Sequence, residues 1–305
     1  MNVLIIGLGS IAHKHIKVLK EINPNTSFFA FRSSKLSVNV PGVQDLFQWE
    51  DVLSQNFDFC IISSPSSLHL SHLQLVEVLK IPIFIEKPVF INRNQINDFK
   101  MLDLKNLRSY VACNFRFNPI VEFLKDDLKI KNKNIYEVTA YCGSYLPNWR
   151  PNKDYREVYS SIKELGGGVN IDLIHEPDYF VHLFGFPENT MVHNRKVSSL
   201  EINSNDSSII YFSYKNFQAS ITLNYFRKHA RRTLEIVTDE KTIFVDFLNG
   251  KVKDLETNTM LYQSSEDLIE ISYKKQMLFF LDNIKSNEFK MNSIDEATTV
   301  LDLIL

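Results

Sequence analysis

Short apolar runs and amphipathic stretches alternate at the start of the chain. Residues 2–7 (NVLIIG) are apolar almost throughout, residues 13–22 repeat their apolar positions at helical spacing, and residues 27–31 (SFFAF) are again mostly apolar. Continuous apolar runs are typical of strands that are buried on both faces of a parallel sheet. The pattern therefore predicts a strand, a helix and a second, parallel strand in succession.

The same alternation continues to about residue 115. A helix is predicted at residues 71–80, and further strands are predicted at 43–47, 57–65, 81–88 and 108–115. Repeated strand–helix units favour a doubly wound parallel sheet, in which ligands bind at the carboxyl ends of the strands. We therefore expect residues 1–115 to form an α/β domain of this kind.

Beyond this point the pattern changes to strands joined by short turns. After a predicted helix at residues 118–128, strands are predicted at 135–145, 207–214, 217–226, 231–239 and 241–248. Turn signals such as Asn249-Gly250 are typical of antiparallel sheets. Residues 116–305 are therefore expected to form an α+β domain with a large, mostly antiparallel sheet that helices cover on one face. A short last helix is predicted at 293–305, with Ser293 as its N-cap.

One face of this sheet carries a row of large apolar side chains. Alternation along two strands and the turn between them groups Ile210, Phe212, Tyr214, Phe217, Ile221 and Tyr225. Such a row suits either a contact between subunits or packing against the covering helices. The sequence leaves both interpretations open.

Composition limits the classes of protein to which the chain can belong. Its 305 residues are enough for two domains, and a formal net charge of −2 gives no reason to expect nucleic acid or an anionic membrane as a partner. Cys60, Cys113 and Cys142 are far apart and lack metal-binding spacing, so neither a disulfide framework nor a metal site is expected. Without a signal sequence or a run of about 18 apolar residues, we expect a cytoplasmic protein outside the membrane.

A glycine-rich turn follows the first predicted strand. Gly7, Gly9 and Ala12 form the pattern Gly-x-Gly-x-x-Ala directly before the first predicted helix. Gly7 permits a tight turn, Gly9 lets a phosphate approach the backbone, and the small Ala12 allows close packing of helix and strand. Backbone amides at a helix N-terminus can hold a pyrophosphate. We therefore predict a dinucleotide-binding Rossmann domain, with cofactor contacts from Gly7, Gly9, Ser10, Ile11 and Ala12.

The end of the second strand indicates which dinucleotide is bound. NAD enzymes usually place an acidic residue there, about 20 residues beyond the glycines. This chain has the sequence Arg32-Ser33-Ser34-Lys35 and no carboxylate. A guanidinium beside hydroxyl groups suits a 2′-phosphate, so NADP(H), bound through Arg32 and Ser33, is favoured over NAD(H). A solvated basic turn is the alternative.

Polar motifs stand at two later strand ends and beyond them. Ser64-Pro65 with His69 follows one strand, Glu86-Lys87-Pro88 ends the next, and Arg116-Phe117-Asn118-Pro119 comes after the last. In this order, and together with the glycine turn, these motifs resemble the Gfo/Idh/MocA family of NAD(P)-dependent sugar and polyol oxidoreductases.

The resemblance implies roles for these residues. It implies that Lys87 projects towards the nicotinamide and the substrate, where an ammonium group can hold a substrate hydroxyl and stabilise negative charge on it. An exposed lysine at a strand end is the alternative. The resemblance also implies a homodimer or homotetramer formed through the second domain's sheet. Cofactor contacts are expected from Ser64, Pro65, His69, Glu86 and Lys87.

Three consecutive glycines, Gly166–Gly168, lead into a segment rich in ionisable residues. Its arrangement D-x-x-H-E-x-D-Y, which begins with Asp172 and His175, resembles a variant branch of the family, whose usual spacing is D-x-x-x-H. The resemblance implies that His175 is the general base and that Asp172 orients it or binds a sugar hydroxyl. The spacing places both on one face of a helix, whereas Pro177 favours a helix that begins near His175. Without the resemblance, His175 is interpreted as a packed or capping histidine.

The stretch before these glycines is rich in aromatic and charged residues and poor in aliphatic ones. Aromatic faces and guanidinium groups suit a polar, hydroxylated or acidic ligand. Arg150 and Arg156 favour an acidic or nucleotide-linked sugar, and a surface loop that clamps the two domains together is an equal alternative. The predicted substrate contacts are Arg116, Tyr145, Trp149, Arg150, Tyr155 and Arg156.

The leading hypothesis is hydride transfer between a nicotinamide and a secondary alcohol or ketone of a sugar or sugar derivative. Three alternatives keep a related fold: a redox-assisted glycosidase that retains NAD, a regulatory protein that binds the dinucleotide without catalysis, and a biliverdin-reductase-like enzyme. Lys87, Asp172 and His175 together favour catalysis, since a sensor needs no groups for proton transfer. The sequence leaves open the sugar, the direction of the reaction, and the roles of Glu176 and Asp178.

Overall fold

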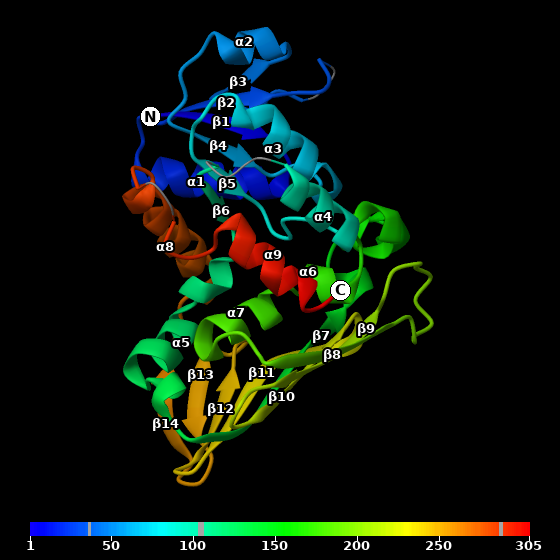
Figure 1. The fold of residues 1–305 in the computed structure, drawn as a ribbon, viewed down its shortest axis with the longest axis vertical. Helices are drawn as coiled ribbons and strands as arrows, with labels where there is room; N and C mark the ends of the chain where they lie inside the picture. The colour runs from blue at the N-terminus through cyan, green and yellow to red at the C-terminus, as the bar shows by residue number, and fades with distance from the viewer. Residues whose placement is uncertain (36–37, 103–106, 287–288) are drawn as a thin grey trace. The chain divides into compact units, whose positions relative to one another are not determined.

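The structure is a computed structural model that describes residues 1–35, 38–102, 107–286 and 289–305 (Figure 1). Contacts within the chain divide it into two compact units. The first unit consists of residues 1–114 and 273–299, and the second consists of residues 115–272 and 300–305. The chain thus returns to the first unit near its end, which the apolar pattern of that region does not predict.

The first unit contains a six-stranded parallel sheet in the order β3-β2-β1-β4-β5-β6. Its strands are β1 (Asn2–Ile6), β2 (Ser27–Phe31), β3 (Val43–Leu46), β4 (Phe59–Ile62), β5 (Ile83–Ile85) and β6 (Ser109–Val111). The doubly wound parallel sheet predicted from the sequence is confirmed. The strand order reverses between β1 and β4, where folds of this kind bind their ligands.

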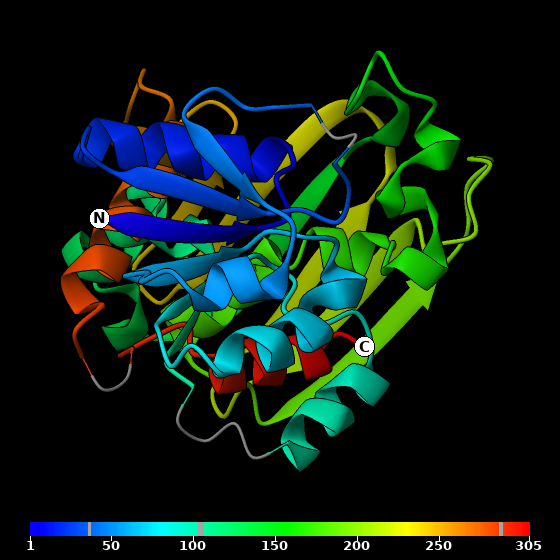
Figure 2. The ribbon, with the colours of Figure 1, turned by 90° about the horizontal axis from the view of Figure 1, so that it is seen from above.

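Helices lie on both faces of this sheet. Figure 2 shows α1 (Ser10–Ile22), in dark blue, on one face, and α3 (His69–Glu77) and α4 (Arg93–Met101), in cyan shades, on the other. The short α2 (Trp49–Leu53) follows β3. Helices on both faces are the reason that the central strands β1, β4 and β5 are apolar almost throughout rather than alternating.

An aromatic cluster packs against the middle of this sheet. It includes the helix α8 (Leu268–Asn283), whose residues from Tyr273 onward belong to the first unit. The ring centroid of Phe280 lies 5.0 Å from that of Phe59 in β4 and 5.2 Å from that of Phe84 in β5, and all three residues are completely buried. Because burial of a phenylalanine stabilises a fold by about 1.5–3 kcal/mol, this cluster explains why the end of the chain joins the first unit.

The second unit contains an eight-stranded sheet in the order β14-β13-β12-β11-β7-β10-β9-β8. Among the described strands of this second sheet, only β7 and β10 pair in parallel, so the predicted, mostly antiparallel sheet is confirmed. The strands are β7 (Ile135–Tyr145), β8 (Asn189–Arg195), β9 (Ser207–Ser213), β10 (Gln218–Asn224), β11 (Phe226–Thr238), β12 (Thr242–Asp246), β13 (Lys251–Asp254) and β14 (Thr259–Gln263).

Short helices lie on one face of this second sheet, as Figure 1 shows. They include α5 (Pro119–Glu122), α6 (Val169–Asp172) and α7 (His175–Phe184). The rings of α7 pack on the sheet: the centroid of Phe180 lies 6.2 Å from that of Phe212, and the centroid of Phe184 lies 6.4 Å from that of Tyr214. The apolar row of β9 and β10 therefore faces the helices. The alternative hypothesis, that this row forms a subunit contact, is wrong.

The last helix, α9 (Ile294–Asp302), is short, as the sequence predicts. Its start is capped by Ser293, whose hydroxyl oxygen accepts a hydrogen bond from the backbone N–H of Glu296 at 3.2 Å. Within the described ranges, no helix has the length and apolar character needed to cross a membrane.

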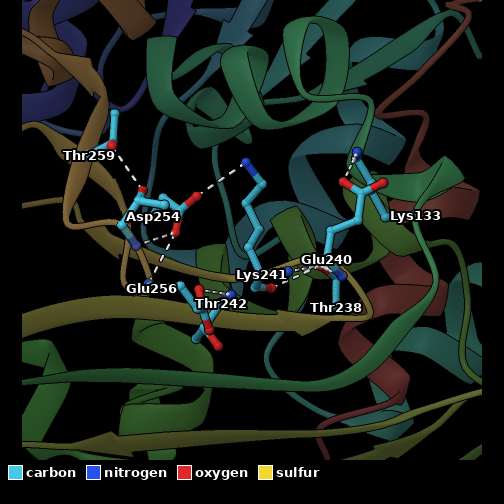
Figure 3. A network of polar contacts seen from close by, with 9 residues as sticks. Lys133, Thr238, Glu240, Lys241, Thr242, Asp254, Glu256 and Thr259 are labelled. Atoms are coloured by element: carbon cyan, nitrogen blue, oxygen red, sulfur yellow. Dashed lines mark hydrogen bonds and ion pairs between the residues drawn. The ribbon is translucent and has the colours of Figure 1, made fainter.

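Ion pairs fasten the turn between β11 and β12 to neighbouring segments (Figure 3). Lys133 Nζ lies 2.7 Å from Glu240 Oε2, and Lys241 Nζ lies 3.3 Å from Asp254 Oδ2. Most of these side chains are partly exposed, and such pairs contribute about 0–1 kcal/mol each. The network orders one end of the sheet.

Candidate active site

The glycine turn of the first unit is closed by the turn that follows β4. Gly7 has a φ of +92°, and a Cβ atom added there would lie 2.3 Å from the backbone nitrogen of Ser64. The hydroxyl of Ser63 donates a hydrogen bond to the Gly7 carbonyl at 2.8 Å. Gly9 is the N-cap of α1, and a Cβ atom added there would have nothing within 4 Å. The fold therefore requires Gly7, whereas Gly9 leaves open space beside the helix N-terminus.

A pair of alanine variants should separate these two requirements. Gly7→Ala is expected to destabilise the first unit by roughly 1–3 kcal/mol, because its methyl group would overlap backbone atoms. Gly9→Ala should fold like the wild type and bind the predicted dinucleotide more weakly, since its methyl group would occupy the open space. Urea unfolding and calorimetric titration with NADH measure the two effects. Equal unfolding midpoints for the two variants would contradict this account of the turn.

A buried carboxylate links the first helix to the Glu86-Lys87-Pro88 turn. Glu86 Oε1 lies 2.6 Å from Nε2 of His15 in α1, and Glu86 Oε2 accepts a hydrogen bond from the backbone N–H of Lys87 at 3.2 Å. Glu86 is 8% exposed and His15 is 1% exposed. The peptide bond between Lys87 and Pro88 is cis. Glu86 thus holds the turn that carries Lys87 against the helix that follows the glycines.

Histidines brace the turn after β4. His69 is completely buried, with Nε2 3.0 Å from the carbonyl oxygen of Ser64 and Nδ1 3.2 Å from that of Val89. Burial lowers the pKa of His69. The hydroxyl of Ser64 lies 2.8 Å from Nδ1 of His72, and Pro65 is exposed. With both ring nitrogens against carbonyl groups, His69 braces this turn, and its contact with a cofactor stays a prediction.

The arginine predicted to bind a 2′-phosphate has an acidic partner. Arg32 Nη1 lies 3.1 Å from Asp45 Oδ1 in β3, and each side chain is 12% exposed. Ser33, the next residue, is exposed. The basic turn is therefore salt-bridged rather than simply solvated. The end of β2 has no carboxylate of its own, and the carboxylate that pairs with Arg32 comes from Asp45 in the neighbouring strand.

In the second unit, Asp172 accepts hydrogen bonds from tyrosine hydroxyls. Tyr159 donates to one oxygen of its carboxylate and Tyr225 donates to the other. Asp172 is 6% exposed, and Tyr225 is completely buried. Burial, and then the charge of Asp172, raise the pKa of Tyr225 well above its ordinary value. Tyr225 therefore stays a protonated donor that fixes the carboxylate in place.

Close packing or a positive φ favours glycine at each of the three positions before this helix. A Cβ atom added at Gly167 would lie 2.4 Å from the carbonyl oxygen of Tyr159. Gly166 and Gly168 have φ angles of +91° and +143°, and residues with a Cβ atom rarely adopt such a backbone conformation. The glycine run thus brings the start of α6 against the segment that carries Tyr159, and this contact places Asp172 within reach of the tyrosine hydroxyl.

A break separates Asp172 from His175. The helix α6 ends at Asp172, and α7 begins at His175 with Pro177 in its first turn. A helix that begins near His175 is therefore confirmed, and a single helix face shared by Asp172 and His175 is wrong. Proline suits the first turn because N–H groups there have no partner within the helix. His175 is partly exposed, with its ring centroid 6.0 Å from that of Phe115.

The other acidic residues of this segment form buried ion pairs. Asp178 accepts two hydrogen bonds from Arg116, from Nη2 at 2.7 Å and from Nε at 3.0 Å. Glu176 Oε1 lies 2.6 Å from Nη2 of Arg232, whose guanidinium lies 3.5 Å from the ring centroid of Phe115. Glu176 and Asp178 therefore hold α7 in place. Arg116, predicted as a substrate contact, is buried and pairs with Asp178, and its contact with a substrate stays a prediction.

Several predicted substrate residues lie together after β7. Trp149, Arg150 and Tyr155 line one small hollow. The ring of Trp149 packs edge to face against Tyr225, with a centroid distance of 5.3 Å. Because Tyr225 donates to Asp172, packing connects this loop to the candidate catalytic carboxylate.

The remaining residues of this predicted set lie in different surroundings. Arg156 Nη2 lies 2.6 Å from Asp154 Oδ2, and its Nη1 lies 3.1 Å from Glu201 Oε2. Tyr145, at the end of β7, is partly buried. Since acidic neighbours compensate the charge of Arg156, the electrostatic argument for an acidic substrate depends on Arg150.

His15, Asp45 and Tyr225 help to complete these arrangements, and no sequence motif assigns any of them to the site. Helical spacing could have identified His15, because it lies on the buried face of the helix that follows the glycine turn. No comparable pattern in the sequence points to Asp45 or Tyr225. Asp45 comes close to Arg32 only because β2 and β3 pair side by side. Tyr225 belongs to a row of apolar side chains, and alternation alone does not tell whether that row faces the helices or the outside of the sheet.

Two family models match this sequence. The model described as "Oxidoreductase family, NAD-binding Rossmann fold" matches residues 1–108, and the model described as "Oxidoreductase family, C-terminal alpha/beta domain" matches residues 128–271. Both are models of the Gfo/Idh/MocA family, and together they cover most of the chain. The chain belongs to the Gfo/Idh/MocA family.

Solved structures share the fold at low sequence identity. A myo-inositol dehydrogenase from Corynebacterium glutamicum is 17% identical, with a TM-score of 0.76 over 99% of this chain and 94% of that one. A UDP-N-acetylglucosamine 3-dehydrogenase from Acidithiobacillus ferrooxidans is 16% identical, with a TM-score of 0.73 and the same coverage. An oxidoreductase from Agrobacterium radiobacter, in complex with NAD⁺, L-tartaric acid and magnesium, is 14% identical, with a TM-score of 0.79 over 99% and 94% of the chains. No curated protein is similar enough in sequence to count as a match.

Membership of the Gfo/Idh/MocA family places the chain among oxidoreductases. Residues 1–108 match the NAD-binding Rossmann domain of that family. The structure fits a dinucleotide there, because open space at Gly9 adjoins the N-terminus of the 13-residue helix α1. The family resemblance drawn from the sequence motifs is confirmed.

Proposed function

We propose that this enzyme transfers hydride between a nicotinamide cofactor and a secondary alcohol or ketone of a sugar or sugar derivative. Accepting or donating the hydride is the chemistry that a bound nicotinamide supplies. The observation that carries the proposal is the position of Glu86, which joins the helix after the glycine turn to the backbone of Lys87. This contact couples the candidate catalytic lysine to the helix that binds the cofactor.

Three side chains are proposed to perform the chemistry at the substrate hydroxyl. The ammonium group of Lys87 donates a hydrogen bond to the reacting oxygen and stabilises its negative charge as the C–H bond breaks. His175 accepts the hydroxyl proton during oxidation and returns it during reduction. Asp172 orients His175 or a sugar hydroxyl, and the hydroxyls of Tyr159 and Tyr225 keep it rigid for this task.

The loop after β7 is proposed to contact the sugar through Tyr145, Trp149, Arg150 and Tyr155. Aromatic faces pack against the C–H groups of a ring, and a guanidinium can bind a carboxylate or a phosphate through two parallel hydrogen bonds. Arg150 is the proposed anion contact, because acidic neighbours compensate Arg156. An acidic or nucleotide-linked sugar is therefore the proposed substrate class. The similar fold of a dehydrogenase that acts on UDP-N-acetylglucosamine supports it.

Between the two nicotinamide cofactors, we propose a preference for NADP(H). Arg32 and Ser33 at the end of β2 offer a guanidinium and a hydroxyl group to a 2′-phosphate, which is a chemistry that phosphate sites commonly use. NAD(H) is the cofactor named for the family, so binding of both is expected, with Arg32 and Ser33 favouring NADP(H).

The test is a substrate screen with the purified enzyme. NAD⁺ and NADP⁺ are each combined with myo-inositol, glucose, glucuronate and UDP-N-acetylglucosamine, and the reduced nicotinamide is followed by its absorbance. We expect at least one sugar or polyol to reduce a cofactor. Cleavage of an aryl glycoside without net cofactor turnover would replace this proposal with a redox-assisted glycosidase. Tight dinucleotide binding without turnover in either direction would replace it with a regulatory role.

A further inference from the structure

A salt bridge adjoins the proposed 2′-phosphate contact in the first unit. The strands β2 and β3 pair in parallel with Ala30 opposite Asp45, and Arg32 follows directly after β2. Arg32 Nη1 lies 3.1 Å from Asp45 Oδ1, and both side chains are 12% exposed. Arg32 Nη2 donates a further hydrogen bond to the carbonyl of Val38 at 3.4 Å. Groups of this chain therefore already hold both terminal nitrogens of the guanidinium.

We infer that Asp45 sets the choice of cofactor by competing with the 2′-phosphate for Arg32. This inference rests on the proposed dinucleotide site. A phosphate monoester carries about −1.5 to −2 charges at neutral pH, which a lone guanidinium attracts strongly and a neutral arginine–aspartate pair attracts far less. NAD(H) has a hydroxyl group at this position, so the pair imposes no such penalty on it. Asp45 thus weakens the preference for NADP(H) that Arg32 alone would give.

The surroundings of the pair strengthen this competition. Because both side chains are mostly buried, solvent and salt screen the charge of Asp45 only in part. The neighbouring cation, Lys35, has its ammonium group 5.7 Å from the ring centroid of Phe47. A lysine acts as a point charge, whereas Arg32 offers the planar fork that matches a phosphate. To bind a 2′-phosphate through this fork, Arg32 must therefore give up its contact with Asp45 or with the carbonyl of Val38.

The test is calorimetric titration of the wild type and three matched variants with NADPH and, separately, with NADH. The variants are Asp45→Asn, Arg32→Gln and Asp98→Asn, which removes an exposed carboxylate from α4 as a control for net charge. We expect Asp45→Asn to bind NADPH about tenfold more tightly, a change of about 1.4 kcal/mol, with unchanged affinity for NADH. Asp98→Asn should match the wild type, and Arg32→Gln should bind NADPH more weakly and NADH equally well.

The variants distinguish failure of this inference from failure of the proposed site. If Arg32→Gln weakens NADPH binding and Asp45→Asn leaves it equal or weaker, Asp45 positions Arg32 or plays no part, and the inference is wrong. If Arg32→Gln leaves NADPH binding unchanged, the proposed phosphate contact is wrong and the inference fails with it. Should Asp45→Asn unfold at a lower urea concentration than the wild type, Asp45→Ser repeats the test with a smaller side chain.

Discussion

Replacing Asp178 by asparagine is expected to lower the free energy of unfolding by about 3–5 kcal/mol. The carboxylate accepts two hydrogen bonds from Arg116, at 2.7 and 3.0 Å, and both side chains are 1% exposed. Asparagine has nearly the same size but no charge, so the buried guanidinium of Arg116 would lose the two charge-assisted hydrogen bonds that the Asp178 carboxylate accepts. The measurement is urea-induced unfolding of the variant and the wild type, followed by circular dichroism.

The chain contains a matched control in the pair of Asp154 and Arg156. This pair has similar geometry, with Nη2 2.6 Å from Oδ2, but its arginine is 53% exposed and its aspartate is 33% exposed. Solvent screens such a pair, so Asp154→Asn should cost no more than about 1 kcal/mol. Similar losses in the two variants would show that burial does not determine the strength of the Asp178 pair.

The roles of the charged residues in the second unit could not be predicted from the sequence, because their partners are distant along the chain. Arg116 and Asp178 are 62 positions apart. Arg232 reaches Glu176 from β11 and stacks on Phe115. In a sequence, an arginine that binds a substrate cannot be distinguished from one that neutralises a buried carboxylate. The distinction needs the burial of both partners, which only the packed helix and sheet provide.

The fold could be predicted wherever the short-range pattern determines it. The strands at 27–31 and 135–145 have the predicted bounds, because their apolar residues alternate or run without interruption. The strand β8 was not predictable in this way, since its residues alternate between exposed and half-exposed at the edge of the sheet and present no apolar face. The helix α8 was missed because its aromatic residues pack on strands from the start of the chain.

The candidate site was predictable to the extent that backbone geometry specifies it. Gly7 could be identified because a positive φ and a close approach leave glycine as the suitable residue. For Glu86, the motifs imply a cofactor contact, and in the structure one oxygen of its carboxylate accepts a hydrogen bond from the backbone N–H of Lys87. The partner on its other oxygen, His15, lies on a different element, so no local pattern connects the two.

Replacing His175 by glutamine is expected to lower kcat by about 10²–10⁴-fold. Glutamine keeps a hydrogen-bonding side chain of similar reach, but it cannot accept the hydroxyl proton of the substrate. His175 is partly exposed at the start of α7, so the buried residues of that helix, such as Phe180, keep their packing. Cofactor affinity and the urea midpoint should therefore match the wild type. The measurement is kcat across a pH series with the best substrate of the screen, together with titrations of NADH and NADPH.

His182→Gln is the matched control on the same helix. Burial, together with the charges of Arg116 and Lys125, lowers the pKa of His182 to about 3. This imidazole is therefore neutral throughout the assay range and exchanges no proton with the substrate near neutral pH. Only the His175 variant should lose kcat, because only there does the replaced imidazole exchange a proton with the substrate. A wild-type kcat in His175→Gln, or equal losses in both variants, would contradict the role of His175 as the general base.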